Sequence, residues 1–145
     1  MIDVGGYTLT VDRAATTAAY ARGVDGPEAC ACWYCRNWIE GRERLLPPAV
    51  RELLDTLGIP ANGEIEVWEV RGDEQPHGYG GWYMAVGQVL QAPEAPAHQF
   101  VLGDWRLSFS SGVTYPVEAF NEMPTFELHF FTWAGDYIDG NPDVA

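Results

Sequence analysis

Apolar residues repeat with a helical period just before the middle of the chain. They follow Pro47-Pro48 and precede Gly58, and they are Val50, Leu53, Leu54 and Leu57. This i, i+3, i+4, i+7 spacing is typical of one face of an amphipathic helix, and glycine commonly ends such a helix. The pattern predicts a helix that begins near Pro48, ends at Gly58 and buries these four side chains.

Two further segments of the first half have helical character. The stretch from Glu28 to about Leu45 is too long for a strand, and Asp25 or Gly26 ahead of Pro27 suits a helix start. A short helix is predicted over residues 14–21, before the Arg22-Gly23 break.

After Gly58 the period changes to two, which is typical of strands with one buried face. Alternating segments occupy residues 64–67, 82–90 and 126–130, and residues 4–11 near the start of the chain have the same pattern. Gly103-Asp104 separates two short apolar segments, 100–102 and 105–109, as the turn of a tight hairpin does. These segments therefore predict antiparallel strands.

The order of these elements predicts the fold class. Helices in the first half and strands in the second favour α+β, because alternating βα units are absent. We expect an antiparallel sheet of about five strands, with the helices of the N-terminal half packed on one face. A length of 145 residues suits one domain, which we place at residues 1–145.

The charge narrows the classes of partner. The chain has 21 acidic residues, eight arginines and no lysine, so its formal net charge is -13. Proteins bind nucleic acids and anionic membranes through basic patches. Because this chain is strongly acidic, we expect neither as a partner. A basic protein would match this charge, and the favoured alternative is that the charge only keeps the protein soluble. The start of the chain has no basic segment followed by an apolar stretch, so we expect a cytoplasmic protein.

Three cysteines, Cys30, Cys32 and Cys35, occupy six consecutive positions. Their odd number and the expected reducing compartment predict free thiols. Closely spaced thiolates can bind zinc, but a closed structural site needs four protein ligands. The candidates for the fourth ligand are His77, His98 and His129. Two alternatives remain open, because cysteines are often buried as small apolar residues and Cys32 to Cys35 is also a C-x-x-C redox pattern.

The cysteine segment also carries a resemblance. Cys32-Trp-Tyr-Cys35-Arg36-Asn37 and the later Tyr79-Gly-Gly-Trp82 resemble a group of uncharacterised bacterial proteins that share a C-x-x-C-R-N segment and a Y-G-G-W segment. The similarity spans about residues 30–90. It implies a shared fold and no particular activity, since none is established for that group.

Four residues of these segments are candidates for binding a ligand or partner: Arg36, Asn37, Tyr79 and Trp82. The guanidinium and the amide can hold carbonyl or carboxylate groups. The structural alternative is that both residues tie their helix to a loop, for example to the acidic residues Glu64, Glu66 and Glu69. The second segment is interpreted as an aromatic-flanked turn at the entry to a strand.

Established catalytic motifs are missing from the sequence. The sequence contains no phosphate-binding loop, dinucleotide-binding motif, nucleophile elbow of hydrolases or zincin motif. The alternating Glu64 and Glu66 are interpreted as the solvated side of a strand. Our main hypothesis is a non-enzymatic binding protein, such as an acidic inhibitor or toxin antagonist that recognises another protein. The alternatives are a metal- or thiol-dependent enzyme centred on the cysteines, and a protein with a purely structural zinc.

Overall fold

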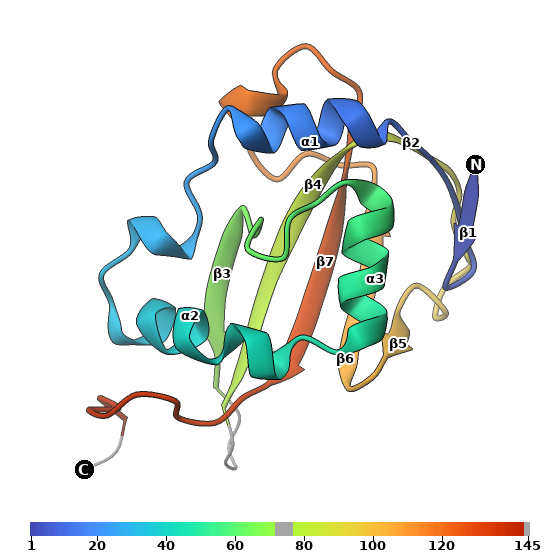
Figure 1. Cartoon of the computed structure of the whole chain (residues 1–145). Helices are drawn as coiled ribbons and strands as arrows, with labels where there is room; N and C mark the ends of the chain where they lie inside the picture. The colour runs from blue at the N-terminus through green and yellow to red at the C-terminus, as the bar shows by residue number, and fades with distance from the viewer. Residues whose placement is uncertain (72–76, 144–145) are drawn as a thin grey trace.

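Across residues 1–71 and 77–143, which the computed structural model describes, the chain forms an antiparallel sheet of seven strands and three α-helices (Figure 1). The helices are α1 (Arg13–Ala21), α2 (Trp33–Leu45) and α3 (Pro48–Leu57), with short 3₁₀ helices η1 (Pro27–Ala29) and η2 (Glu118–Phe120). The strands are β1 (Ile2–Val4), β2 (Tyr7–Val11), β3 (Glu66–Val70), β4 (Gly78–Gln91), β5 (Phe100–Leu102), β6 (Trp105–Ser110) and β7 (Thr125–Trp133). The predicted α+β class is confirmed.

The sheet is organised around β4, which has 14 residues. The strand order is β1-β2-β4-β7-β6-β5, and β3 pairs with the first part of β4 while β2 pairs with its last part. The sheet has more strands than the expected five. One reason is the segment predicted as a single strand over residues 4–11, where positive φ angles at Gly5 (58°) and Gly6 (85°) turn the chain into the β1–β2 hairpin.

Helices α2 and α3 cover one face of the sheet (Figure 1). The four apolar residues predicted for the buried face of α3 are all in the main core, together with Trp38 of α2 and Tyr83 of β4. Leu54 is only 1% exposed. Gly58 ends α3 in the left-handed conformation, with φ of 81°. The helical pattern therefore predicted both the extent and the orientation of α3.

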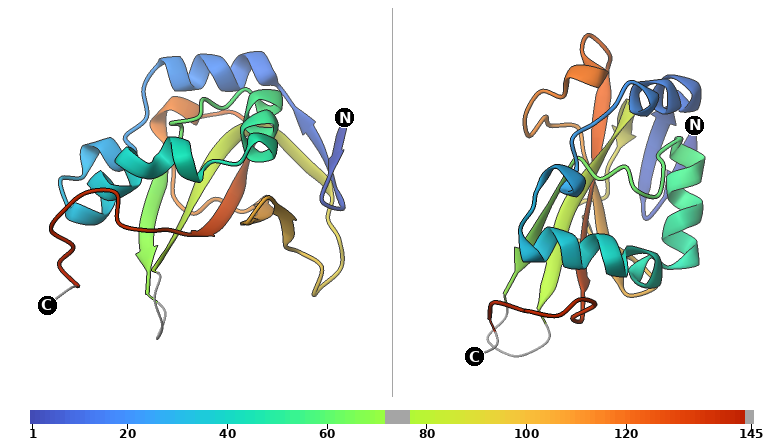
Figure 2. Two further views of the ribbon diagram at one scale, coloured as in Figure 1. Left: turned by 60° about the horizontal axis from the view of Figure 1, so that its bottom comes forward. Right: turned by 60° about the vertical axis from the view of Figure 1, so that its left-hand side comes forward.

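The other face of the sheet has a smaller core. Helix α1 lies across the end of the sheet, and the segment that contains η2 covers the upper part of the face opposite α2 and α3 (Figure 2). Ala19 of α1 and Phe120 of η2 pack here with Trp82, Met84 and Val86 of β4. The predicted alternation of these β4 residues is confirmed.

Helix α2 and strand β3 begin later in the chain than predicted. Helix α2 begins at Trp33 rather than Glu28, because residues 27–29 form η1 and Cys30 is extended (φ -103°, ψ 133°). Strand β3 begins at Glu66, and Glu64 precedes it and is 1% exposed. The interpretation of Glu64 as part of a solvated strand face was therefore wrong.

The predicted turn at Tyr79 to Trp82 was also wrong, because these residues lie within β4. The glycines between them allow close packing. A Cβ at Gly80 would lie 2.7 Å from Nε1 of Trp68, and one at Gly81 would lie 2.5 Å from the carbonyl oxygen of Glu66. Such distances are shorter than van der Waals contact, so glycine is required here by the neighbouring strand and not by a turn. Residues 72–76, between β3 and β4, lie outside the described residues.

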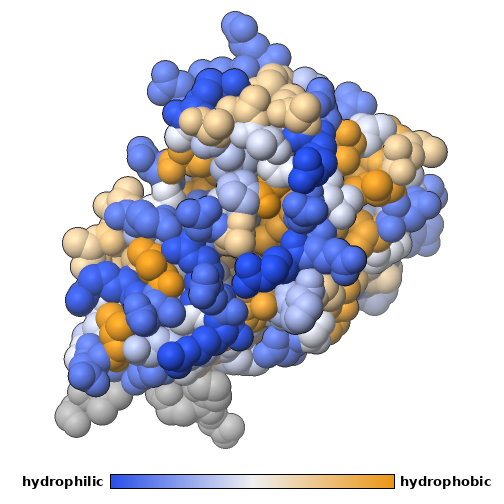
Figure 3. All heavy atoms as spheres, in the orientation of Figure 1, coloured by the Kyte–Doolittle hydropathy of each residue, from blue (hydrophilic) through white to orange (hydrophobic). Residues whose placement is uncertain are grey.

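Within the described ranges, no helix combines the length and the apolar character needed to cross a membrane. The helix-covered face is mostly hydrophilic at its surface, with smaller groups of hydrophobic residues between the polar ones (Figure 3).

Candidate functional site

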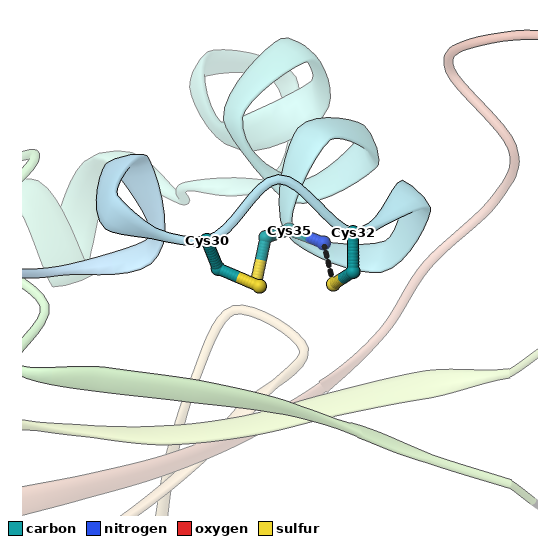
Figure 4. A group of neighbouring side chains, drawn as sticks. All are labelled: Cys30, Cys32 and Cys35. Atoms are coloured by element: carbon teal, nitrogen blue, oxygen red, sulfur yellow. Dashed lines mark hydrogen bonds between the residues drawn. The ribbon is translucent and has the colours of Figure 1, made fainter.

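The three cysteines lie together where η1 leads into α2. Cys30 ends η1, Cys32 is the N-cap of α2, and Cys35 is in its first turn. Their Sγ atoms all lie within 4.8 Å of one another. All three side chains project toward the same side of this junction (Figure 4). The three sulfurs therefore form one cluster at the start of α2.

Local hydrogen bonds explain this arrangement. The backbone N–H of Cys35 donates to Sγ of Cys32 at 3.4 Å, and the N–H of Arg36 donates to the Cys32 carbonyl oxygen at 3.1 Å. The N–H of Cys30 donates to the Pro27 carbonyl oxygen at 3.0 Å. A 3₁₀ turn followed directly by a capped α-helix thus brings positions i, i+2 and i+5 together.

The three thiols have different environments. Cys30 and Cys32 are exposed, whereas Cys35 is 8% exposed. The pKa of the Cys30 thiol is lowered, first by the hydrogen bond from the Cys32 backbone and then by the neighbouring thiols. The pKa of the Cys35 thiol is raised, mainly by burial. Cys30 therefore supplies a thiolate more readily than Cys35 does, and a bound cation would favour deprotonation of Cys35.

His77 is buried near this region but does not join the cluster. Within the described residues, the group of close ligand atoms contains the three cysteines alone. The His77 ring lies against Trp33 and Tyr79, with ring centroids 6.1 and 5.6 Å apart. Its Nδ1 atom is 3.8 Å from Oδ1 of Asp136.

The other two histidines lie elsewhere in the fold. The carbonyl oxygen of His98 accepts a hydrogen bond from the Tyr7 hydroxyl at 2.6 Å, which places His98 beside β2. His129 of β7 stacks on Trp82, and its Nε2 is 2.8 Å from Oε1 of Glu127. The structure thus brings no predicted histidine into the set of sulfur ligands.

Comparisons of the chain with protein-family models, with curated proteins and with solved structures found no match. What the site can do must therefore be argued from its own residues.

Arg36 and Asn37 have opposite environments. Arg36 is exposed, whereas Asn37 is 0% exposed. The Asn37 amide nitrogen donates to the Gly135 carbonyl oxygen at 3.0 Å, and its oxygen accepts from the backbone N–H groups of Tyr137 and Ile138. Asn37 therefore ties its helix to a loop, as the structural alternative predicted. The loop is the segment after β7 and not the acidic residues near β3.

Tyr79 and Trp82 were candidates for binding a partner, but both are core residues. They are 1% and 0% exposed. The Tyr79 hydroxyl donates to the Tyr34 carbonyl oxygen at 2.8 Å, which attaches β4 to α2. Neither side chain is accessible to a partner in this structure. Tyr79 supports the helix that carries Cys35, whereas Trp82 packs in the smaller core on the opposite face of the sheet.

Sequence reasoning missed a buried ion pair behind the cysteine segment. Nη1 of Arg42 lies 2.8 Å from Oε2 of Glu64, and Trp38 Nε1 donates to Oε1 of the same carboxylate at 3.1 Å. The sequence did contain one indication that Arg42 is buried, because it follows Trp38 by four residues and shares its helix face. A charge at a core-facing helix position needs a buried partner.

The donor set determines the chemistry that this site can support. Three sulfurs within 4.8 Å of one another could hold a metal ion. Sulfur ligands favour soft or borderline ions such as zinc and monovalent copper, and disfavour magnesium and calcium.

Proposed function

We propose that the protein binds a thiophilic metal ion through Cys30, Cys32 and Cys35, and that zinc is this ion. The observation that carries the proposal is the approach of all three Sγ atoms to within 4.8 Å of one another. Zinc–sulfur bonds of about 2.3 Å in tetrahedral geometry place ligand sulfurs about 3.8 Å apart. A small contraction of the cluster would therefore accommodate the ion.

Three protein ligands leave the fourth zinc position to a water molecule or another molecule. This is the coordination of catalytic and exchangeable zinc sites rather than of closed structural sites. The exposure of Cys30 and Cys32 supports access from solvent. Three thiolates give the zinc site a net negative charge, which makes its bound water a weaker acid than water on a zinc held by three histidines. A binding or transfer role for the metal is thus favoured over hydrolysis.

A competition titration tests this function. Fully reduced protein is titrated with Zn²⁺ against a chromophoric chelator, with Mg²⁺ and Ca²⁺ as hard-ion controls. We expect one Zn²⁺ per chain, release of thiol protons, and loss of tight binding in Cys30→Ser, Cys32→Ser and Cys35→Ser. Arg36→Ala, which changes an exposed neighbour, should bind as the wild type does. Zinc binding that survives all three cysteine substitutions would disprove the site, and no binding would disprove the function.

Recognition of a protein partner is our second proposal, supported by exposed aromatic residues on the sheet. Trp68 of β3 and Trp133 of β7 are 41% and 42% exposed. Strand alternation places both on the face opposite α2 and α3, on the side of Gly80 and Phe131. Exposed tryptophan is enriched in interfaces and can stack on cationic groups, which fits a basic partner for an acidic chain.

Calorimetric titration with an arginine-rich peptide tests this second function, with an acidic peptide of equal length as control. We expect salt-sensitive binding of the basic peptide that is weakened in Trp68→Ala and in Trp133→Ala. Equal binding by these two variants would exclude the aromatic face as the contact surface.

A further inference from the structure

We infer that Glu28 is a positioning residue of the proposed metal site, because its ion pair with Arg42 holds Cys30 beside Cys32 and Cys35. The inference rests on the proposed function. Oε1 of Glu28 lies 2.7 Å from Nη2 of Arg42. Glu28 is the middle residue of η1, and Cys30 is the residue that ends it. The ion pair therefore attaches the Cys30 segment to the body of α2.

The need for such an attachment follows from where the three ligands lie in the chain. Cys32 and Cys35 belong to the first turn of α2, and the helix itself fixes their relative positions. Cys30 lies outside α2, and its backbone is bonded to Pro27 of η1. Its Sγ reaches the other two sulfurs only when η1 keeps its position against α2. The Glu28–Arg42 pair is a direct side-chain bond between these two helices.

Arg42 is held independently of Glu28. Its side chain is 10% exposed, and Nη1 pairs with Glu64, whose side chain is 0% exposed. A carboxylate that accepts from both Arg42 and Trp38 fixes the guanidinium in one orientation. Nη2 is then directed at η1, where Glu28 accepts from it. The buried Arg42–Glu64 pair thus acts as the anchor, and Glu28 is the residue that it holds.

The chain also passes close to Glu64 just before η1. A Cβ added at Gly26 would lie 2.5 Å from the Glu64 carbonyl oxygen. Gly26 is the N-cap of η1, so the start of η1 contacts the same loop that supplies the carboxylate for Arg42. Contacts at Gly26 and Glu28 together leave little freedom for Cys30, two residues later.

Glu28 is the better residue to change, because its side chain is 49% exposed. Replacing Arg42 would leave Glu64 buried without its cation, and such a variant is expected to unfold. Glu28→Ala removes only the half-exposed partner and leaves the Arg42–Glu64 pair in place. Glu28→Gln keeps an oxygen that can accept from Arg42 and removes the charge. Glu40→Ala, which removes an exposed acid of α2, the helix of Arg42, is the control for charge alone.

The first experiment measures Zn²⁺ affinity by chelator competition for the wild type and these three variants. Loss of outer contacts to metal ligands typically costs about 10–100-fold in affinity. We expect a loss in this range for Glu28→Ala, a smaller loss for Glu28→Gln, and an affinity for Glu40→Ala within about twofold of the wild type. With Co²⁺ as probe, the sulfur-to-metal charge-transfer band should weaken in Glu28→Ala, as expected when fewer thiolates bind. Unchanged affinity and spectrum in Glu28→Ala would overturn the inference.

A second experiment needs no metal. In a Cys32→Ser background, Cys30 and Cys35 are equilibrated with reduced and oxidised glutathione. Forming the protein disulfide oxidises both thiols and reduces one glutathione disulfide to two glutathione molecules. The equilibrium constant gives the effective concentration of one thiol relative to the other, which reports how close the two sulfurs are held. We expect Glu28→Ala to lower this effective concentration about tenfold or more, and Glu40→Ala to leave it unchanged. A wild type that fails to bind Zn²⁺ would remove the proposed function, whereas equal effective concentrations with and without Glu28 would remove the positioning role.

Discussion

The side-chain amide of Asn37 in α2 donates a hydrogen bond of 3.1 Å to the hydroxyl of Tyr79 in β4, and both side chains are buried. The same hydroxyl donates to the Tyr34 carbonyl oxygen of α2, and the same amide bonds the segment after β7. Two polar residues of the core thus join the helix that carries Cys35, the central strand and the C-terminal segment.

We predict that Asn37→Ala lowers the free energy of unfolding by at least about 2 kcal/mol, because each buried polar group that loses its partner costs about 1–3 kcal/mol. Arg36→Ala is the matched control at the adjacent exposed position, with an expected change within about 0.5 kcal/mol. Denaturant unfolding of both variants measures the difference. Equal stabilities would mean that Asn37 does not act as a structural tie.

These residues also indicate which features could be predicted from the sequence. The buried face of α3 and the clustering of the cysteines follow from local spacing, and local spacing is visible in a sequence. The burial of Asn37, Tyr79 and Glu64 depends on segments distant in the chain, and no local pattern reveals it. For the same reason the sequence left the histidines as equal candidates for the fourth ligand, although the fold places all three outside the cluster.

The glycines of β4 test whether close packing against the neighbouring strands requires glycine at these positions. We predict that Gly81→Ala destabilises the protein by about 1–3 kcal/mol, the usual cost of overpacking, because its Cβ would meet the backbone of β3 and the Phe130 ring. Gly135→Ala is the control, since its Cβ would have no atom within 4 Å. If Gly81→Ala proved as stable as Gly135→Ala in thermal unfolding, close strand packing would not be the reason for this glycine.

Leu54 tests the main core. We predict that Leu54→Ala lowers the free energy of unfolding by about 2–5 kcal/mol, because it leaves a cavity at a site that is 1% exposed. Glu52→Ala, on the exposed side of the same helix, should change it by less than about 0.5 kcal/mol. Chemical denaturation measures the free energy of unfolding of both variants. A loss below about 1 kcal/mol for Leu54→Ala would contradict the observed packing of α3.

We predict that the protein loses stability at alkaline pH because of its buried tyrosines. Burial raises the pKa of the Tyr20, Tyr79 and Tyr83 phenols above the ordinary value. In the unfolded chain these phenols ionise near pH ~10, whereas in the folded protein they stay protonated at that pH. Stability should therefore be complete below pH ~10 and should fall as the pH rises toward the folded-state pKa values.

Phenolate absorbance measured together with circular dichroism tests this alkaline transition. The buried tyrosines should ionise only as the protein unfolds, so their rise in phenolate absorbance should coincide with the loss of circular dichroism. Ionisation of all the tyrosines near pH ~10 with the fold intact would contradict the burial of these hydroxyls.

The last prediction separates metal ligation from the structural roles of the cysteines. A ligand that binds only the folded state stabilises it by about 2.7 kcal/mol at a free concentration of 100 times its Kd. We therefore expect Zn²⁺ to raise the melting temperature of the wild type and a chelator to reverse the shift. The metal-free protein should still fold, because its core of helices and strands does not include the cysteine site.

Cys32→Ser and Cys35→Ser should behave differently without metal. Cys32 is the N-cap of α2, and serine is a preferred N-cap, so the metal-free stability of Cys32→Ser should equal or exceed that of the wild type. Cys35 is 8% exposed, so Cys35→Ser buries a hydroxyl and should destabilise the metal-free protein. Both variants should lose the stabilisation by Zn²⁺, because each lacks one sulfur. If Cys32→Ser were stabilised by Zn²⁺ as strongly as the wild type, Cys32 would be a helix cap and not a metal ligand.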